Sequence, residues 1–159
     1  MDRFLVLPFW LAGQHLGVPL DKVIRVLPAL LYTPLPGAPS TVFGVVNVRG
    51  KILPVVDLAM RFAWPAAQLS NLWQPFLWLK TQQRELLVPV EAVEAAVSCT
   101  SHDFAPASHP QIPSCILKGV VRTGEGLLLI QDVEQVLSDA DEEHLAAALA
   151  ASANDHEIR

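Results

Sequence analysis

The sequence has few of the residues on which catalysis, metal binding or secretion depends. Only two cysteines occur, Cys99 and Cys115, and their separation fits neither a zinc site nor a redox pair. We therefore expect reduced thiols in a reducing compartment. His102 and His109 share one loop, for which a solvated loop is the better interpretation than a metal site. Because a phosphate-binding loop and a nucleophile elbow are also missing, we expect no enzyme, no cofactor and no metal.

Long apolar runs are missing as well. No run approaches the ~20 residues that a membrane helix needs, and the N-terminal stretch "FLVLPFWLAG" lacks the basic start and cleavage site of a signal peptide. Charged residues make up only 17% of the chain, against 52% hydrophobic residues. We expect a cytoplasmic protein without direct membrane insertion. Its apolar residues exceed what the core can bury, so that some apolar surface is available to a partner.

The charge is unevenly distributed along the chain. The net charge is −5, but residues 1–131 hold ten Lys/Arg against eight Asp/Glu, whereas residues 132–159 hold eight acids and one arginine. Neither part offers the basic stripe that a phosphate backbone requires. We therefore expect no nucleic-acid binding, and an acidic C-terminal segment.

Short apolar runs broken by Gly, Pro, Asn and Asp predict a chain rich in β-strands. We expect one extended segment over 16–27 and hairpins over 43–56, 75–90 and 115–131, with proline-rich loops at 32–41 and 101–114. Asp57 and Asp132 follow strands and are expected to cap short helices. A third capping pattern, Asp139 with Glu142, precedes a predicted helix over "EHLAAALAAS".

Two segments of the chain occur twice. "GVVNVRGKILPVVDL" at 44–58 shares its first glycine and its aspartate with "GVVRTGEGLLLIQDV" at 119–133, 75 positions later. "VPLDKVIRV" at 18–26 matches "VPVEAVEAA" at 88–96, 70 positions later. Two matches in the same order at nearly the same offset indicate a duplication into two small β-barrels in tandem, with the division near residues 64–75.

The segment "GVVNVRGKILPVVDLAMRF" resembles the signature of CheW-like domains, and "LKGVVRTGEGLLLIQDVEQVLS" is similar to that family's closing hairpin and helix. The resemblance runs from about residue 4 to residue 138. It implies a mainly β fold of two tandem SH3-like five-stranded β-barrels sharing a core, with short helices and a C-terminal helix. We predict one domain over 1–138, followed by an acidic, alanine-rich helical tail over 139–159. Within the domain, the first repeat covers about 16–63 and the second about 75–138. Residues 1–15 and 64–138 are mixed by possible strand exchange.

The resemblance also implies a non-enzymatic adaptor that couples the cytoplasmic tip of a methyl-accepting chemoreceptor to the regulatory domain of a CheA-type histidine kinase, beside membrane-anchored receptor arrays. Carried over by position, the protein-binding residues are Val23, Arg25, Gly44, Val45, Arg49 and Gly50. Family members commonly carry glutamate at the position of Arg25. Since reversing a charge on a contact strand changes which partner is complementary, we expect a dedicated chemosensory system.

Several alternatives stay open at this point. Arg49 could be a turn residue that forms a structural salt bridge, for example with Asp57. Gly44 and Gly119 are better explained by architecture, because glycine permits close backbone approach. The whole chain could instead be a decoy or brake that binds the kinase without coupling it to a receptor, or an unrelated small-barrel module that binds a peptide or RNA.

Overall fold

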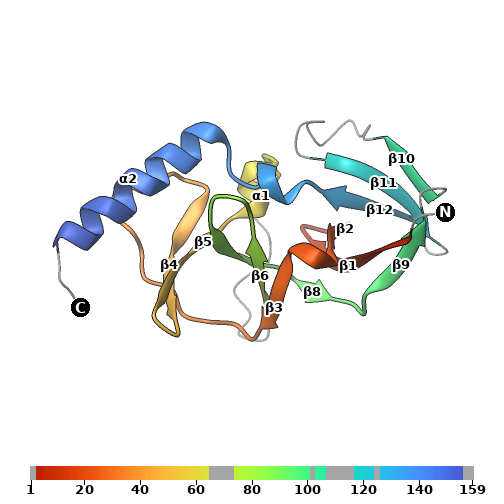
Figure 1. Ribbon diagram of the computed structural model, residues 1–159, viewed down its shortest axis with the longest axis horizontal. Coiled ribbons are helices and arrows are strands. Elements are labelled where there is room, and N and C mark those ends of the chain that lie inside the picture. The colour runs from red at the N-terminus through yellow and green to blue at the C-terminus, as the bar shows by residue number, and fades with distance from the viewer. Residues whose placement is uncertain (1–2, 65–73, 101–102, 107–116, 124–125, 156–159) are drawn as a thin grey trace.

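The computed structural model describes residues 3–64, 74–100, 103–106, 117–123 and 126–155. These residues form two β-sheets that lie side by side, and the long helix α2 lies against the first sheet, at the end of the molecule far from the second (Figure 1). The mainly β architecture, with short helices and one C-terminal helix, confirms the predicted fold class.

The first sheet has five strands from two distant parts of the chain. In spatial order they are β3 (Val23–Leu27), β6 (Phe76–Lys80), β7 (Glu85–Pro89), β5 (Lys51–Val56) and β4 (Val42–Val48). Beyond β4, Thr33 forms an isolated bridge with Val45. The segment that follows β3 therefore returns along β4, which brings the two ends of the sheet towards each other.

The second sheet has seven strands. Six run in the order β10 (Phe104–Pro106), β11 (Leu117–Thr123), β12 (Gly126–Gln131), β2 (Gln14–Pro19), β1 (Arg3–Leu11) and β8 (Ala92–Val93), and β9 (Val97–Thr100) also pairs with β1. This number exceeds the five strands expected for a barrel, partly because β8 and β9 are consecutive short strands along the same edge of β1.

The core has three parts, which explains why the strands are apolar on both faces. The largest cluster draws residues from both sheets, such as Phe9 and Leu16 from the second and Leu77 and Val88 from the first. Each sheet also encloses a smaller cluster of its own. Along β6, side chains alternate between the shared cluster and the first sheet's own cluster. The expected shared core is confirmed.

Each sheet combines strands from both copies of the repeat. The β1–β2 hairpin precedes the first copy's β4–β5 hairpin in sequence but pairs with β12, and the β6–β7 hairpin pairs with β3 and β5. The two parallel pairings are equivalent. Val55 pairs with Leu87 and Ile130 pairs with Gly17, and these positions are related by the same offsets of 75 and 70 residues that separate the sequence repeats. The copies have exchanged hairpins reciprocally.

The expected single extended segment over 16–27 is broken in the middle. Pro19 ends β2, and the 3₁₀ turn η1 (Leu20–Lys22) leads into β3, which belongs to the other sheet. Proline has no backbone N–H to continue a ladder, and this favours the end of a strand here. The chain crosses between the two sheets at this point.

The predicted caps are present, with one shift. The Asp57 carboxylate accepts a hydrogen bond from the Met60 amide before α1 (Leu58–Arg61), and Asp132 accepts one from the Glu134 amide before the 3₁₀ turn η3 (Val133–Gln135). Helix α2 (Asp139–Asp155) is instead capped by Ser138, whose hydroxyl accepts from the Asp141 amide. A serine satisfies the first free amides as well as an aspartate would.

Candidate functional site

The turn between β4 and β5, which we call the Arg49 corner (Val48–Lys51), has an uncommon backbone conformation. Val48 pairs with Lys51, so Arg49 and Gly50 form a two-residue turn, with φ values of 53° and 88°. The Asn47 side chain accepts a hydrogen bond from the Gly50 amide at 2.9 Å. Positive φ suits Gly50, but at the first turn position asparagine or glycine is preferred over arginine. Arg49 therefore occupies a strained position.

The Arg49 side chain offers no structural reason for that strain. It is exposed, and among the described residues it forms neither a hydrogen bond nor an ion pair. Asp57, the acid considered as its partner, caps α1 instead. A strained backbone that presents an unpaired guanidinium to solvent makes Arg49 a candidate for contact with another molecule.

Gly44 and Val45 have a different role in the same hairpin. Gly44 is buried, and a Cβ atom added there would lie 2.3 Å from the Thr33 carbonyl oxygen. Val45 and Thr33 exchange two backbone hydrogen bonds of 2.8 Å each. Only glycine permits this close crossing. Gly44 can therefore influence a partner only by positioning the segment around Thr33.

Val23 and Arg25 lie on β3, at the other end of the strand order. Val23 is partly buried and packs against the shared core, whereas Arg25 is exposed and has no ion pair among the described residues. Their neighbours Ile24 and Val26 are exposed apolar side chains. The exposure of Ile24 and Val26 was not predictable from the sequence, because β-branched residues are equally typical of a buried strand.

Two more apolar side chains follow β3 in the segment that leads to Thr33. Leu31 is 89% exposed, and Tyr32 is exposed with its ring tilted against Phe43 at a centroid distance of 5.6 Å. We call Ile24, Val26, Leu31 and Tyr32 the apolar edge. Several exposed apolar side chains along one segment are typical of a surface that a partner covers.

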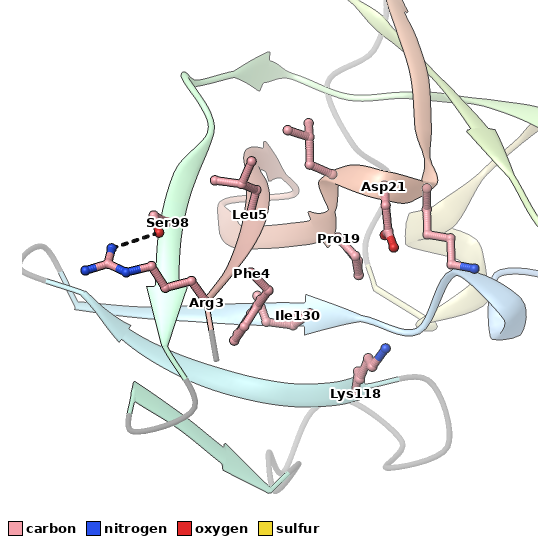
Figure 2. Close-up of a pocket in the computed structure, with 10 residues that line it drawn as sticks. Arg3, Phe4, Leu5, Pro19, Asp21, Ser98, Lys118 and Ile130 are labelled. Atoms are coloured by element: carbon pink, nitrogen blue, oxygen red, sulfur yellow. Dashed lines mark hydrogen bonds between the residues drawn. The ribbon is translucent and has the colours of Figure 1, made fainter. Parts of the chain in front are cut away.

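The second sheet carries a cleft of about 1000 Å³, which we call the basic-rimmed cleft. Leu5 from β1 and Pro19 and Leu20 from the β2–η1 crossing form much of its apolar floor. Figure 2 shows the basic side chains of Arg3 and Lys118 on different sides of that floor. The cleft was not predictable from the sequence, because its lining residues lie as far apart as Arg3 and Ile130.

A polar cluster connects the β1–β2 turn to the bend between β8 and β9. The rings of Trp10 and His15 stack at 4.3 Å, and both side chains contact Glu94: the Trp10 indole N–H donates to one carboxylate oxygen at 3.0 Å, and His15 Nε2 lies 2.9 Å from the other. The hydrogen bond from Trp10, followed by that of His15, lowers the pKa of Glu94. The cluster fastens the hairpin tip to the bend.

The remaining candidates for chemistry gain no support. Burial raises the pKa of the Cys99 thiol, which makes it less reactive, and Cys115, His102 and His109 lie outside the described residues. Within the described ranges, no three His, Cys, Asp or Glu side chains gather as metal ligands would. The same part of the chain contains no helix that is both long and apolar enough to cross a membrane.

Both the sequence and the fold of this chain are similar to those of known proteins. The family model described as "CheW-like domain" matches residues 5–141. The chemotaxis protein CheW of Treponema pallidum is 25% identical over 152 residues, which cover 91% of this chain and 88% of that protein. Protein FrzA of Myxococcus xanthus is 50% identical over 54 residues, about a third of each chain. The crystal structure of the scaffolding protein TtCheW from Thermoanaerobacter tengcongensis has a similar fold, with a TM-score of 0.78 and 21% identity over 86% of this chain and 88% of that one.

Proposed function

The chain belongs to the family of CheW-like domains, and on this premise we propose that it is a non-enzymatic adaptor of a chemosensory system. It binds the regulatory domain of a CheA-type histidine kinase and the cytoplasmic tip of a methyl-accepting chemoreceptor. It does so in the cytoplasm, beside membrane-anchored receptor arrays. The proposal is supported by relatives named as chemotaxis proteins and by the fold shared with a scaffolding protein.

The conformation of Arg49 is the observation that carries the contact role. An arginine at φ 53° in a two-residue turn costs on the order of 1 kcal/mol relative to a residue suited to that conformation. No described hydrogen bond or ion pair offsets this cost within the chain. A partner carboxylate that accepts both arms of the guanidinium offsets it in the complex.

The adaptor needs no chemistry of its own. The Arg49 corner and the apolar edge with Arg25 provide a charged anchor and an apolar surface for the partners. Coupling requires that the adaptor bind the active and inactive arrangements of the kinase with different affinities, because equal affinity would shift no equilibrium. This surface is supported by the packing of Val23 and Val45. Gly44 permits the close approach of the Thr33 segment, and Gly50 forms part of the turn.

The test is a pull-down from the native lysate with wild type and Arg49→Asn as baits. Asparagine removes the guanidinium but suits positive φ, so the unfolding midpoint should stay the same or rise. We expect the wild type to recover a CheA-type kinase and a chemoreceptor, and the variant to recover at least about tenfold less of one of them. Lys80→Asn, which removes an exposed cation from β6 of the same sheet, should behave like the wild type.

The outcomes separate the alternatives. If the wild type recovers the kinase but no receptor, the chain is a brake rather than a coupler, and a receptor-coupled kinase assay would show inhibition. If Arg49→Asn recovers both partners as well as the wild type does, Arg49 is not at the contact. Recovery of neither partner by the wild type would refute the adaptor function itself.

A further inference from the structure

The floor of the basic-rimmed cleft is apolar and partly open to solvent. Leu5 is 50% exposed although its strand β1 is paired on both sides within the sheet. Its neighbour Val6 points into the second sheet's own core, whereas Leu7 lies on the same face as Leu5 and belongs to the shared core. The cleft therefore borders the shared core through Leu20 and the second sheet's own core through Phe4 and Ile130. A concave apolar surface of this kind is typical of a binding groove.

The rim of the cleft is basic. Among the residues that the structure describes, three cations line it, Arg3, Lys22 and Lys118, against the single carboxylate of Asp21. The Arg3 guanidinium donates to the Ser98 hydroxyl at 3.4 Å, and the Lys22 ammonium is 3.8 Å from a Glu134 carboxylate oxygen. Lys118 is exposed and has no ion pair within the described ranges. The rim therefore attracts negative charge.

We propose that the basic-rimmed cleft docks an acidic amphipathic segment of a partner protein, with carboxylates on both sides of a row of apolar side chains. The cations come from β1, η1 and β11, and Figure 2 shows Arg3 and Lys118 on different sides of the apolar floor. A small anion would need donors that converge on one point, whereas flanking carboxylates match this spread of charge. This inference rests on the adaptor function and gives it a second docking surface, on the other sheet from the Arg49 corner.

The test uses a labelled synthetic helical peptide with a leucine stripe flanked by glutamates, and fluorescence anisotropy with the full-length chain. We expect binding that weakens as salt is added, because salt screens the rim charges. A peptide with lysine flanks and one with alanine in place of the leucine stripe should not bind. Lys118→Glu and Leu5→Ser should each weaken binding about tenfold. Lys80→Glu, the same charge change on the first sheet, should leave the affinity unchanged.

Several results would overturn the proposal. Equal binding of the lysine-flanked peptide would remove the charge argument, and an equal effect of Lys80→Glu and Lys118→Glu would show that only net charge matters. If the peptide does not bind but dodecanoate does, the cleft binds a small amphiphile. If the peptide does not bind and the chain self-associates through a contact that Lys118→Glu removes, the cleft binds a second copy.

The two proposals fail in different ways. If the wild type recovers neither kinase nor receptor from lysate but binds the peptide through the cleft, the adaptor function fails and the cleft assignment stands. If the peptide does not bind, and Lys118→Glu and Leu5→Ser recover both partners as the wild type does, the cleft assignment fails and the adaptor function stands.

Discussion

At the scale of single residues, Gly44 and Arg49 belong to one hairpin but are constrained by opposite surroundings. Gly44 is buried beneath the Thr33 carbonyl, so any side chain there must displace the neighbouring backbone. Arg49 faces solvent in a conformation that its side chain disfavours. A substitution at Gly44 therefore acts through the fold, whereas one at Arg49 acts through whatever the guanidinium contacts.

The Glu94 cluster predicts a dependence of stability on pH. The pKa of Glu94 in the folded protein lies below its usual value of 4.5, because the carboxylate accepts hydrogen bonds from Trp10 and His15. Its contribution is therefore fully present above pH 4.5 and is lost as the pH falls through the lower folded pKa. We expect the wild type to melt above Glu94→Gln near neutral pH, with a gap that closes in acid.

Thermal unfolding followed by Trp fluorescence from neutral to acid pH measures this gap. Glu143→Gln removes an equally negative and likewise exposed carboxylate from α2, which lacks the hydrogen bonds of Glu94, and should show no such gap. A Glu94→Gln gap that is the same at every pH would mean that the ionised carboxylate is not what holds the hairpin tip.

At the scale of elements, α2 is attached to the first sheet by more than its apolar face. Leu145 is fully buried in the shared core. Arg84, in the turn between β6 and β7, donates to Glu142 through two nitrogens in a partly buried ion pair, and the Thr41 hydroxyl donates to Asp141 at 2.8 Å. Two of the acids that make the C-terminal segment negative therefore have partners in the sheet.

We expect Leu145→Ala to lower the free energy of unfolding by about 2–4 kcal/mol, because it leaves a cavity in the shared core. Ala147→Ser, on the exposed side of the same helix, should change it by less than about 0.5 kcal/mol. Urea denaturation measures both. Equal effects would mean that α2 is a dispensable tail, and a chain ending at Ser138 would then keep the full stability.

The elements show what local sequence can and cannot predict. The hairpins over 43–56 and 75–90 were predictable because turn residues separate apolar runs, and Asp57 was predictable as a cap. The break at Leu20–Lys22 was not, because β-branched residues on both sides favour one strand. The contacts of α2 could not be predicted either, since Arg84 and Glu142 meet only in the folded chain.

At the scale of the whole molecule, the duplication and a possible strand exchange were visible in the sequence, but which hairpins pair with each other was not. Matching segments at offsets of 70 and 75 residues indicate that a unit is repeated. They do not say which copy each strand pairs with, because Val55 could meet a strand of either copy with the same local pattern. The basic-rimmed cleft depends on that pairing, as its lining comes from both halves of the chain.

The exchange predicts that neither half folds alone. The fragment 1–64 contains β1 and β2 without β12, and the fragment 74–159 contains β6 and β7 without β3 and β5. We expect each fragment to lack a cooperative thermal transition, and an equimolar mixture to regain one. Circular dichroism and sedimentation of the fragments and their mixture check this. A cooperative transition in either fragment would show that one sheet is self-sufficient.

The crossing at Leu20–Lys22 has its counterpart after β7, where the chain passes from the first sheet to β8 in the second. Two covalent crossings and one continuous core hold the described parts of the two sheets together. We therefore expect the two sheets to move as one rigid body. A partner that rotates the first sheet at the Arg49 corner should then rotate the second sheet by the same angle.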